Sequence, residues 1–425
     1  MNKFISNLKN NSYLTQIITL ISGTLFAQII SLISIPILTR IYTPDEFGLY
    51  SIFFAVTSVI GMVSSLSYEQ AIVLPKSQRS ADAILLLSII ITSIVTLLTI
   101  VAIYIFREEI ESYFRGESHL IYLIPLSVAT LGVNQILEAY SSRGELYRDI
   151  ASSKVITSST SAISQISSRY LLNIDGLVTG KIFGDLLGSV RLIKGVKRRV
   201  ETLREVSIED LRFNMGRYSE FPKFQMPSNL LNSISQNIPL FMLSLLFSPA
   251  VAGIYSLTYR AMQTPTLLIS SATRSVFYQK ASKIYSRGGE ILPIYISTTM
   301  GLIKLFAIPF IIITIYGQDI FSYIFGEEWR EAGAVAEISV VWFYFGFISP
   351  PTTMTFNILN LQKIRLYIQI VTLIFRTISL YIGYTIFESY MVSIALFVAV
   401  GVIQNIYSML YIFIKLRDRR VPNPN

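Results

Sequence analysis

The sequence predicts an all-α integral membrane protein with twelve transmembrane helices, and three observations lead to this fold class. Hydrophobic residues make up 52% of the 425 residues and charged residues only 14%, whereas a water-soluble protein needs about a quarter charged residues. The apolar residues form runs of the length, roughly 18 residues or more, that spans a hydrocarbon core. Lys and Arg gather in alternate loops between these runs, as expected of a chain that crosses a membrane repeatedly.

Apolar windows between charged breaks place the helices. In order along the chain, the predicted spans are residues 17–38, 48–74, 83–106, 120–140, 150–172, 177–196, 225–247, 252–273, 291–316, 334–356, 366–386 and 390–414.

The basic residues predict the orientation and the domains. The even-numbered loops and the two termini, counted with the span ends that border them, hold 26 Lys and Arg, against 4 in the odd-numbered loops, so both termini are expected in the cytoplasm. Residues 1–196 then form an N-terminal lobe of six helices. Residues 197–224 form a basic cytoplasmic linker, and residues 225–425 form a C-terminal six-helix lobe with a short cytoplasmic tail.

The two halves carry a repeated motif. Tyr42–Ser51 and Phe247–Ser256 both read aromatic, hydroxyl, Pro, three residues, Gly, aliphatic, Tyr, Ser, so Pro44 and Gly48 correspond to Pro249 and Gly253. A second match, Ile110–Glu117 against Ile320–Glu327, has nearly the same offset. Because the offset spans six helices, an even number, the sequence predicts two parallel repeats related by an axis along the membrane normal.

Several function classes lack their motifs. The chain has no cysteine and a single histidine, which argues against a disulfide framework, a thiolate metal site or any resident metal. There is no phosphate-binding loop for an ATPase motor and no hydrolase motif. The net charge of +9 is explained by topology, without a nucleic-acid partner. The longest outer loops are short and mostly acidic, which argues against a membrane glycan polymerase or transferase. We therefore expect a carrier and no enzyme.

Three short segments resemble the Wzx-type polysaccharide and O-antigen flippases, within the superfamily of multidrug, oligosaccharidyl-lipid and polysaccharide exporters. They are Tyr68–Pro75, Pro44–Ser51 and Val276–Ala281. The resemblance implies two six-helix lobes around a central cleft, a MATE-like fold and a place in the bacterial inner membrane. It also implies translocation of an undecaprenyl-diphosphate-linked oligosaccharide, an O-antigen or capsule repeat unit of lipopolysaccharide or polysaccharide biosynthesis, from the cytoplasmic to the periplasmic leaflet.

Charges inside the spans independently favour an anionic substrate. Ionisable residues at membrane depth cost about 3 kcal/mol each on insertion scales, so they usually face a cavity or a partner. Apart from Lys154, Arg191 and Lys194 at the predicted cytoplasmic ends, the basic residues within the predicted spans are Arg169, Lys181, Arg260, Lys304 and Arg376. They are candidates for binding the diphosphate, because Arg and Lys are the side chains that recognise phosphates. Lys181 and Asp185, four residues apart, could instead neutralise each other, and Arg169 could extend to the interface.

Polar side chains within spans provide a candidate wall for the sugars. The span 150–172 contains ten Ser and Thr residues, which serve either as hydrogen-bond partners for sugars or as small residues for close helix packing. The candidates are Gln28, Ser153, Thr157, Thr160, Ser164, Asn232 and Gln236.

The sequence thus predicts a multi-pass flippase that works by alternating access, without a cofactor and with Na⁺ or H⁺ as a conceivable coupling ion. The lipid bilayer surrounds it, and the polysaccharide polymerase machinery is a further candidate partner. Two alternatives stay open: a cation-coupled small-molecule extruder of the same fold, and a membrane glycan polymerase or transferase.

Overall fold

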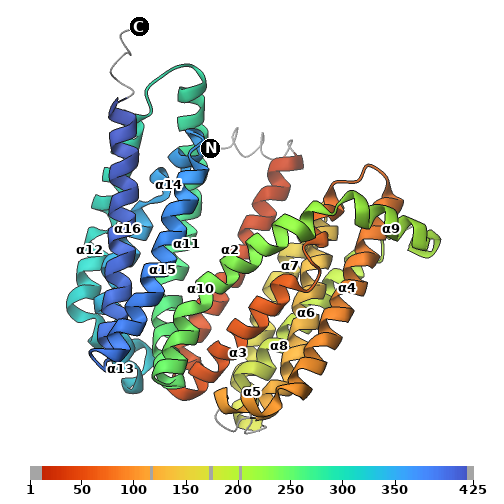
Figure 1. The fold of residues 1–425 in the computed structure, drawn as a ribbon, viewed down its shortest axis with the longest axis horizontal. Coiled ribbons are helices and arrows are strands. Elements are labelled where there is room, and N and C mark those ends of the chain that lie inside the picture. Colours follow the sequence, from red (N-terminus) through yellow and green to blue (C-terminus); the bar gives the residue numbers. More distant parts are fainter. Residues whose placement is uncertain (1–11, 115–117, 172–175, 201–202, 419–425) are drawn as a thin grey trace. The chain divides into compact units, whose positions relative to one another are not determined.

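The computed structural model describes residues 12–114, 118–171, 176–200 and 203–418 (Figure 1). Every regular element within these ranges is a helix. The C-terminal tail predicted to follow the last helix lies outside the described residues from 419 onward.

The chain divides into two compact units. The N-terminal unit comprises Met1–Tyr42 and Leu49–Ile238, and the C-terminal unit comprises Thr43–Gly48 and Pro239–Asn425. Helix α3 (Pro44–Val63) therefore begins in the C-terminal unit and continues in the N-terminal unit, and α10 (Met226–Leu246) passes from the N-terminal to the C-terminal unit. The predicted lobes meet at the linker 197–224, whereas the units divide inside α10.

The helices agree in position with the predicted spans. In the N-terminal unit the other helices are α2 (Ser12–Leu38), α4 (Gln78–Ile105), α5 (Arg107–Tyr113), α6 (Ser118–Arg143), α7 (Tyr147–Leu171), α8 (Gly176–Val196) and α9 (Ile208–Arg217). In the C-terminal unit they are α11 (Pro249–Ser286), α12 (Leu292–Phe325), α13 (Arg330–Ile348), α14 (Pro350–Ile358), α15 (Gln362–Thr385) and α16 (Tyr390–Asp418).

The predicted span 48–74 is wrong as a single helix. Helix α3 ends at Val63, and Leu66 and Ser67 then take left-handed backbone angles with φ of 51° and 63°. A short 3₁₀ helix, η1 (Tyr68–Val73), follows. The residues at the break include polar side chains, Ser64, Ser65 and Ser67, but the only charge nearby is Glu69, so a span bounded by charged breaks continued through it. The predicted span 334–356 is likewise divided, at Ser349, between α13 and α14.

Eight helices within the described residues are long and apolar enough to cross a membrane. They are α2, α3, α4, α6, α12, α13 with its preceding turn, α15 and α16. The other four predicted spans coincide with α7, α8, α10 and α11, which are long but more polar. The chain is therefore a multi-pass helical membrane protein, and twelve crossings remain a prediction.

A stripe of glycines brings α8 against α7. Gly176, Gly180, Gly184 and Gly188 recur every four residues, so they share one face of α8. A Cβ atom at Gly184 would lie 2.0 Å from the Ser161 hydroxyl, and one at Gly188 would lie 2.0 Å from the Thr157 hydroxyl. The Ser153 hydroxyl donates to the Gly188 carbonyl at 2.8 Å. Small residues on both helices thus allow close packing, as one reading of the Ser and Thr pattern predicted.

The two repeat turns contact each other within the C-terminal unit. A Cβ atom at Gly48 would lie 1.8 Å from the Pro249 carbonyl oxygen, and a Cβ atom at Gly253 would lie 2.1 Å from the Pro44 carbonyl oxygen. Because any side chain would collide with backbone, only glycine permits this approach at either position. The contact is reciprocal, which explains why the Pro and Gly of the motif are repeated together.

The basic segment after α8 contains a helix that is fixed at its start. Ser207 and Asp210 form a reciprocal capping box at the N-terminus of α9. Arg79 pairs with the Asp210 carboxylate at 2.7 Å, which joins α9 to the start of α4. Hydrogen bonds from Ser207 and Arg79 hold the pKa of Asp210 below its usual value of 3.8.

Candidate functional site

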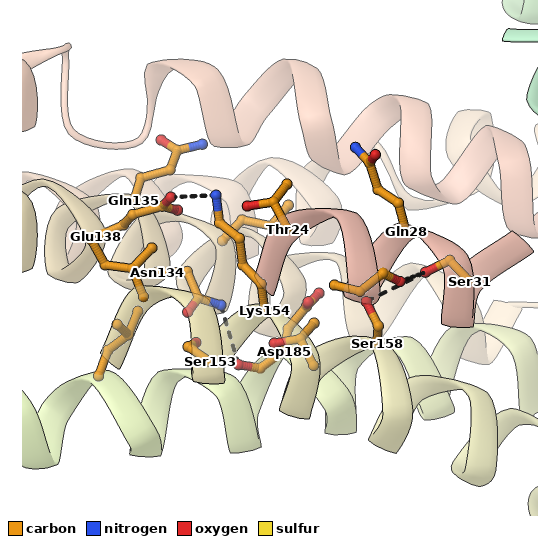
Figure 2. Close-up of a pocket in the computed structure, with 15 residues that line it drawn as sticks. Thr24, Gln28, Ser31, Asn134, Gln135, Glu138, Ser153, Lys154, Ser158 and Asp185 are labelled. Carbon is orange, nitrogen blue, oxygen red and sulfur yellow. Dashed lines mark hydrogen bonds and ion pairs between the residues drawn. The ribbon is translucent and has the colours of Figure 1, made fainter. Parts of the chain in front are cut away.

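The N-terminal unit contains a polar cavity of about 390 Å³ between α2, α6, α7 and α8 (Figure 2). Eleven of its fifteen lining residues have hydroxyl, amide or charged side chains, and apolar groups complete the wall. The lining residues are Thr24, Ala27, Gln28, Ser31, Leu131, Asn134, Gln135, Glu138, Ile150, Ser153, Lys154, Thr157, Ser158, Asp185 and Leu192.

Helical periodicity brings these side chains to one place. Thr24, Gln28 and Ser31 follow one another at four and three residues along α2, so they share a face. On α7, Thr157 and Ser158 lie three and four residues after Lys154, so these side chains also share one face. Each helix therefore presents a polar stripe to the cavity.

An ion pair crosses the cavity. The Lys154 ammonium lies 2.7 Å from a carboxylate oxygen of Glu138, so α7 is joined to α6 (Figure 2). The Asn134 amide donates to the Asp185 carbonyl at 3.1 Å, and Ser31 donates to Ser158 at 3.4 Å. The side-chain oxygen of Gln28 is buried and has no hydrogen-bond partner among the residues that the structure describes. A buried acceptor without a donor is a site where a ligand hydroxyl or a water would be stabilising.

The charges at this cavity balance. Lys154 pairs with Glu138, and Lys181 pairs with Asp185 on the same helix, as one reading of the sequence predicted. The Lys181 ammonium also lies 5.8 Å from the centre of the Phe54 ring. A neutral cavity rich in hydroxyl and amide groups suits an uncharged polyhydroxyl ligand better than a diphosphate, because a diphosphate needs an excess of cationic donors.

The other predicted residues of the N-terminal unit divide into two groups. Gln28, Ser153 and Thr157 line the cavity, whereas Thr160 and Ser164 lie further along α7 and do not line it. Asn232 and Gln236 are exposed on one face of α10. Arg169 lies with its guanidinium 5.4 Å from the centre of the Tyr42 ring.

The three predicted basic residues of the C-terminal unit have different surroundings. Arg376 is partly buried, and its guanidinium lies 4.6 Å from the centre of the Trp342 ring and 4.9 Å from that of Phe397. Arg260 is partly buried on α11, and Lys304 is exposed on a face of α12 that is otherwise apolar. The structure therefore places only Arg376 within a cluster of aromatic side chains.

The sequence interpretation missed two groups of residues. Lys154 lies at the predicted cytoplasmic end of its span and counts toward the basic inner loop in that prediction, although its side chain pairs with Glu138. Arg365 is partly buried beside a small cavity of about 70 Å³, where Arg274 interacts with it electrostatically. A neighbouring pair of arginines with no carboxylate bound to either in the described structure is a feature typical of an anion site.

A helical stripe could have revealed Arg365. Arg365, Gln369, Thr372 and Arg376 follow one another at intervals of four, three and four residues along α15, which places them on one face. The opposite face of α15 is exposed and apolar, with Ile370, Ile374 and Ile378 among its residues. Within the described residues, no group of three or more His, Cys, Asp or Glu is placed to hold a metal ion.

A helical membrane fold with a polar cavity inside one unit defines a class of membrane carrier, and comparisons with known proteins agree with this class. The family model for polysaccharide biosynthesis proteins matches residues 37–334, so the chain belongs to that family. The predicted resemblance to polysaccharide flippases is confirmed at this level.

One curated relative is the teichuronic acid biosynthesis protein TuaB of Bacillus subtilis (strain 168). It is 26% identical over 133 residues, which cover 31% of this chain and 27% of that protein. The matched segment thus spans about a quarter of the relative.

Solved structures share the fold. The lipid II flippase MurJ in an inward closed conformation has a TM-score of 0.71 and 15% identity, over 94% of this chain and 87% of that one. An inward-facing multidrug resistance MATE family transporter of the MOP superfamily also has a TM-score of 0.71 and 15% identity, over 92% of this chain and 95% of that one. These proteins are flippases or transporters, and at this identity the likeness concerns the fold.

Proposed function

We propose that this chain is a flippase that moves an undecaprenyl-diphosphate-linked oligosaccharide from the cytoplasmic to the periplasmic leaflet of the bacterial inner membrane. It acts by alternating access, with twelve membrane crossings and both termini in the cytoplasm. The work of the protein is to provide polar surroundings for a headgroup whose transfer through hydrocarbon alone would be prohibitive.

The neutral polar cavity is the observation that carries this proposal. An exporter of cationic drugs would need an excess of acidic groups in such a place, whereas Glu138 and Asp185 are each paired with a lysine. The remaining lining offers hydroxyl and amide groups, including the unpartnered oxygen of Gln28. Sugar hydroxyls both donate and accept hydrogen bonds, so they match this lining.

The diphosphate needs cationic donors outside this cavity. Arg274 and Arg365 are close enough to interact electrostatically, and neither is paired with a carboxylate in the described structure. Both belong to the basic loops on which the predicted cytoplasmic orientation rests, so they would meet the headgroup on the side where it is synthesised. Arg260 and Lys304 are further candidates along the path, as the sequence interpretation proposed.

The relatives support a substrate of the cell-envelope glycan class. The names of TuaB and MurJ refer to teichuronic acid biosynthesis and to lipid II. In this proposal the chain carries out no catalysis of its own, binds no cofactor, and delivers its substrate to polymerase machinery. A coupling ion, Na⁺ or H⁺, would act through carboxylates such as Glu138.

The decisive experiment is to extract the lipids of cells that lack this protein, determine their masses by mass spectrometry, and measure glycan at the cell surface. Accumulation of a complete undecaprenyl-diphosphate oligosaccharide without surface glycan is the expected result. If single repeat units reach the surface without being polymerised, the chain is a polymerase. If both the lipid pool and the surface are unchanged, the chain is a small-molecule extruder, a function compatible with the fold of the MATE family transporter.

A further inference from the structure

Arg376 is a cation without an anion. Its guanidinium has no hydrogen bond or ion pair to any residue that the structure describes, and its Nε is buried without a partner. The groups that interact with it electrostatically are the hydroxyls of Tyr255 and Tyr259, and no carboxylate is among them. A charged group that is partly removed from water and unpaired is costly unless a ligand pairs with it.

The fold makes room for this guanidinium. Arg376 belongs to α15 and reaches across α16 at Gly401, where a Cβ atom would lie 2.3 Å from Nη2 of Arg376 and 2.8 Å from Nε1 of Trp342. The guanidinium therefore arrives beside aromatic rings of α13 and α16, Trp342 and Phe397. We call Arg376, Trp342, Phe397, Tyr255 and Tyr259 the arginine cage.

The cage has a buried base and an accessible rim. Tyr255 and Phe397 are buried, whereas Tyr259, Trp342 and Arg376 are each partly exposed. The rim thus presents one guanidinium and an indole ring together with the phenol of Tyr259, whose hydroxyl is hydrogen-bonded to the Gln263 side chain. Apolar and aromatic surface with a few directed polar groups is the usual composition of a site for a small organic ligand.

The charge of the rim selects the ligand. One guanidinium matches one carboxylate in a bidentate geometry, while the aromatic rings would cover the C–H face of a sugar ring. A diphosphate carries more charge than one cation balances, and among the described residues no second basic group acts electrostatically on Arg376. The chemistry of the cage therefore fits a sugar that bears a single carboxylate.

The position of the cage along α15 fits a glycan that extends from its diphosphate. Arg365 and Arg376 are 11 residues apart, which is three turns on the same face and about 16 Å along the helix axis. Gln369, which lines the small cavity beside Arg365, lies between them on that face. A short oligosaccharide whose diphosphate contacts Arg365 would bring a sugar beyond the first to the cage.

We propose that the arginine cage is a binding site for an acidic sugar, such as a uronate, within the oligosaccharide that this chain translocates. The proposal rests on the proposed function and adds a substrate class to it: an anionic glycan, recognised by its carboxylate as well as by its diphosphate.

The cage contains its own reporter. The chain has two tryptophans, so Trp329→Phe leaves Trp342 as the only source of indole fluorescence. We would titrate this purified variant with D-glucuronate, with D-glucose as the matched neutral sugar, and with inorganic pyrophosphate. The expected result is a saturable change of emission with glucuronate at concentrations about tenfold lower than with glucose, because a charge-assisted bidentate contact is worth roughly a factor of ten or more.

Variants separate a binding role from a structural role. Arg376→Gln should remove the preference for glucuronate over glucose, and Arg376→Lys should retain part of it. If Trp329→Phe does not fold, the same titration of the unmodified protein, with Trp342→Phe as the control that loses the signal, gives the same information. Equal responses to glucuronate and glucose would overturn the proposal. A response to pyrophosphate at lower concentration than to glucuronate would overturn it as well and assign the cage to the diphosphate.

The lipid analysis of cells lacking the protein distinguishes the two proposals. A complete lipid-linked oligosaccharide that contains a carboxylated sugar supports both. A neutral oligosaccharide would leave the flippase function intact and overturn the acidic-sugar site. An unchanged lipid pool would overturn the flippase function, while the titration still tests the cage.

Discussion

Single glycines decide how closely the helices approach one another in this protein. Gly48 and Gly253 lie where a Cβ atom would collide with a carbonyl oxygen, whereas Gly301 has no atom within 4 Å of the corresponding position. Glycine is therefore required for close packing at Gly48 and Gly253 but not at Gly301. The sequence alone identified only Gly48 and Gly253 as special, because they belong to the repeated motif.

Gly48→Ala should destabilise the protein by about 1–3 kcal/mol, the usual cost of overpacking, because the backbone at Pro249 must move. Gly301→Ala is the matched control and should be neutral or stabilising by up to about 1 kcal/mol, since alanine favours the helix. Thermal unfolding in detergent measures both. Equal melting temperatures for the two variants would contradict the close contact.

Lys154→Gln should reduce glycan export several-fold with little loss of stability. The side chains of Lys154 and Glu138 are 37% and 44% exposed, so their pairing is expected to contribute at most about 1 kcal/mol. Export is scored at the cell surface, and stability by thermal unfolding.

The charge-reversed double variant Lys154→Glu with Glu138→Lys tests what the pair does. Restored export would indicate that only the pairing matters. Export that stays low would indicate that Lys154 itself contacts the substrate. Full export in the single variant Lys154→Gln would contradict a role for the cavity.

The candidate site could be predicted from the sequence in its residue types more than in its geometry. Polar residues inside apolar spans predicted Gln28, Ser153 and Thr157 as site residues, and these three line the cavity. Lys154 was missed because an ammonium near the end of a span looks like an interfacial lysine until its partner on the neighbouring helix is known. Pairings between helices depend on helix rotation, which a single sequence determines poorly.

At the scale of elements, hydropathy located the helices well and their interruptions poorly. The end of α3 is followed by left-handed residues at Leu66 and Ser67, neither of them glycine. The residues after the break are buried, including Tyr68, Ala71 and Ile72. The serines at the break are polar, but serine is also common where membrane helices pack closely, so it did not mark the end of the helix.

Helix α15 shows what an element-scale pattern can reveal. Its polar residues recur at intervals of four, three and four, while its opposite face is apolar and exposed. The sequence analysis singled out Arg376 as a charge at membrane depth and did not relate it to Arg365. The two arginines are related because they share one face of α15. The aromatic rings beside Arg376 come from other helices, so residue spacing could not predict them.

The attachment of α9 should depend on pH through Asp210. Because the pKa of Asp210 is lower in the folded protein, its stabilising effect is complete above the unfolded value of 3.8 and is lost as the pH falls through the folded value. A spin label at Gly216→Cys, a position with no neighbouring atoms in a chain without cysteine, should therefore become more mobile in acid.

Asp210→Asn should give the mobile spectrum already at neutral pH and remove its acid dependence. Glu209→Gln, a neighbouring carboxylate that is exposed, is the control and should behave like the unmodified protein. An acid response that persists in Asp210→Asn would assign the transition to another group.

At the scale of the whole molecule, the two units do not coincide with the two predicted lobes. Helix α3 starts in one unit and continues in the other, and α10 does the same in the opposite direction. Hydropathy and charge place a boundary where the chain leaves the membrane, in the basic segment 197–224. Residue contacts place the boundary between the units inside α10, between Ile238 and Pro239. No change in composition marks this position in the sequence.

A cysteine pair tests whether the N-terminal unit behaves as one body. Asn237 of α10 donates to Ser58 of α3 at 3.4 Å, and both residues belong to that unit. The pair Ser58→Cys with Asn237→Cys should form a cross-link, on a background free of cysteine, and export should stay within about twofold of the reduced protein. Loss of export on oxidation, restored by reductant, would show that α10 moves against α3 during transport.

The reciprocal contact of the repeat turns has a consequence for the history of the chain. A contact in which Gly48 meets Pro249 and Gly253 meets Pro44 is the kind that two identical subunits make across a twofold axis. A six-helix ancestor would have used one glycine and one proline twice, once from each copy. After fusion, the backbone of each turn still packs against the glycine of the other. A substitution that adds a side chain to one turn can therefore be tolerated only if the backbone of the other turn changes as well. The two halves can diverge in their cavities and arginines, but the two repeat turns can change only together.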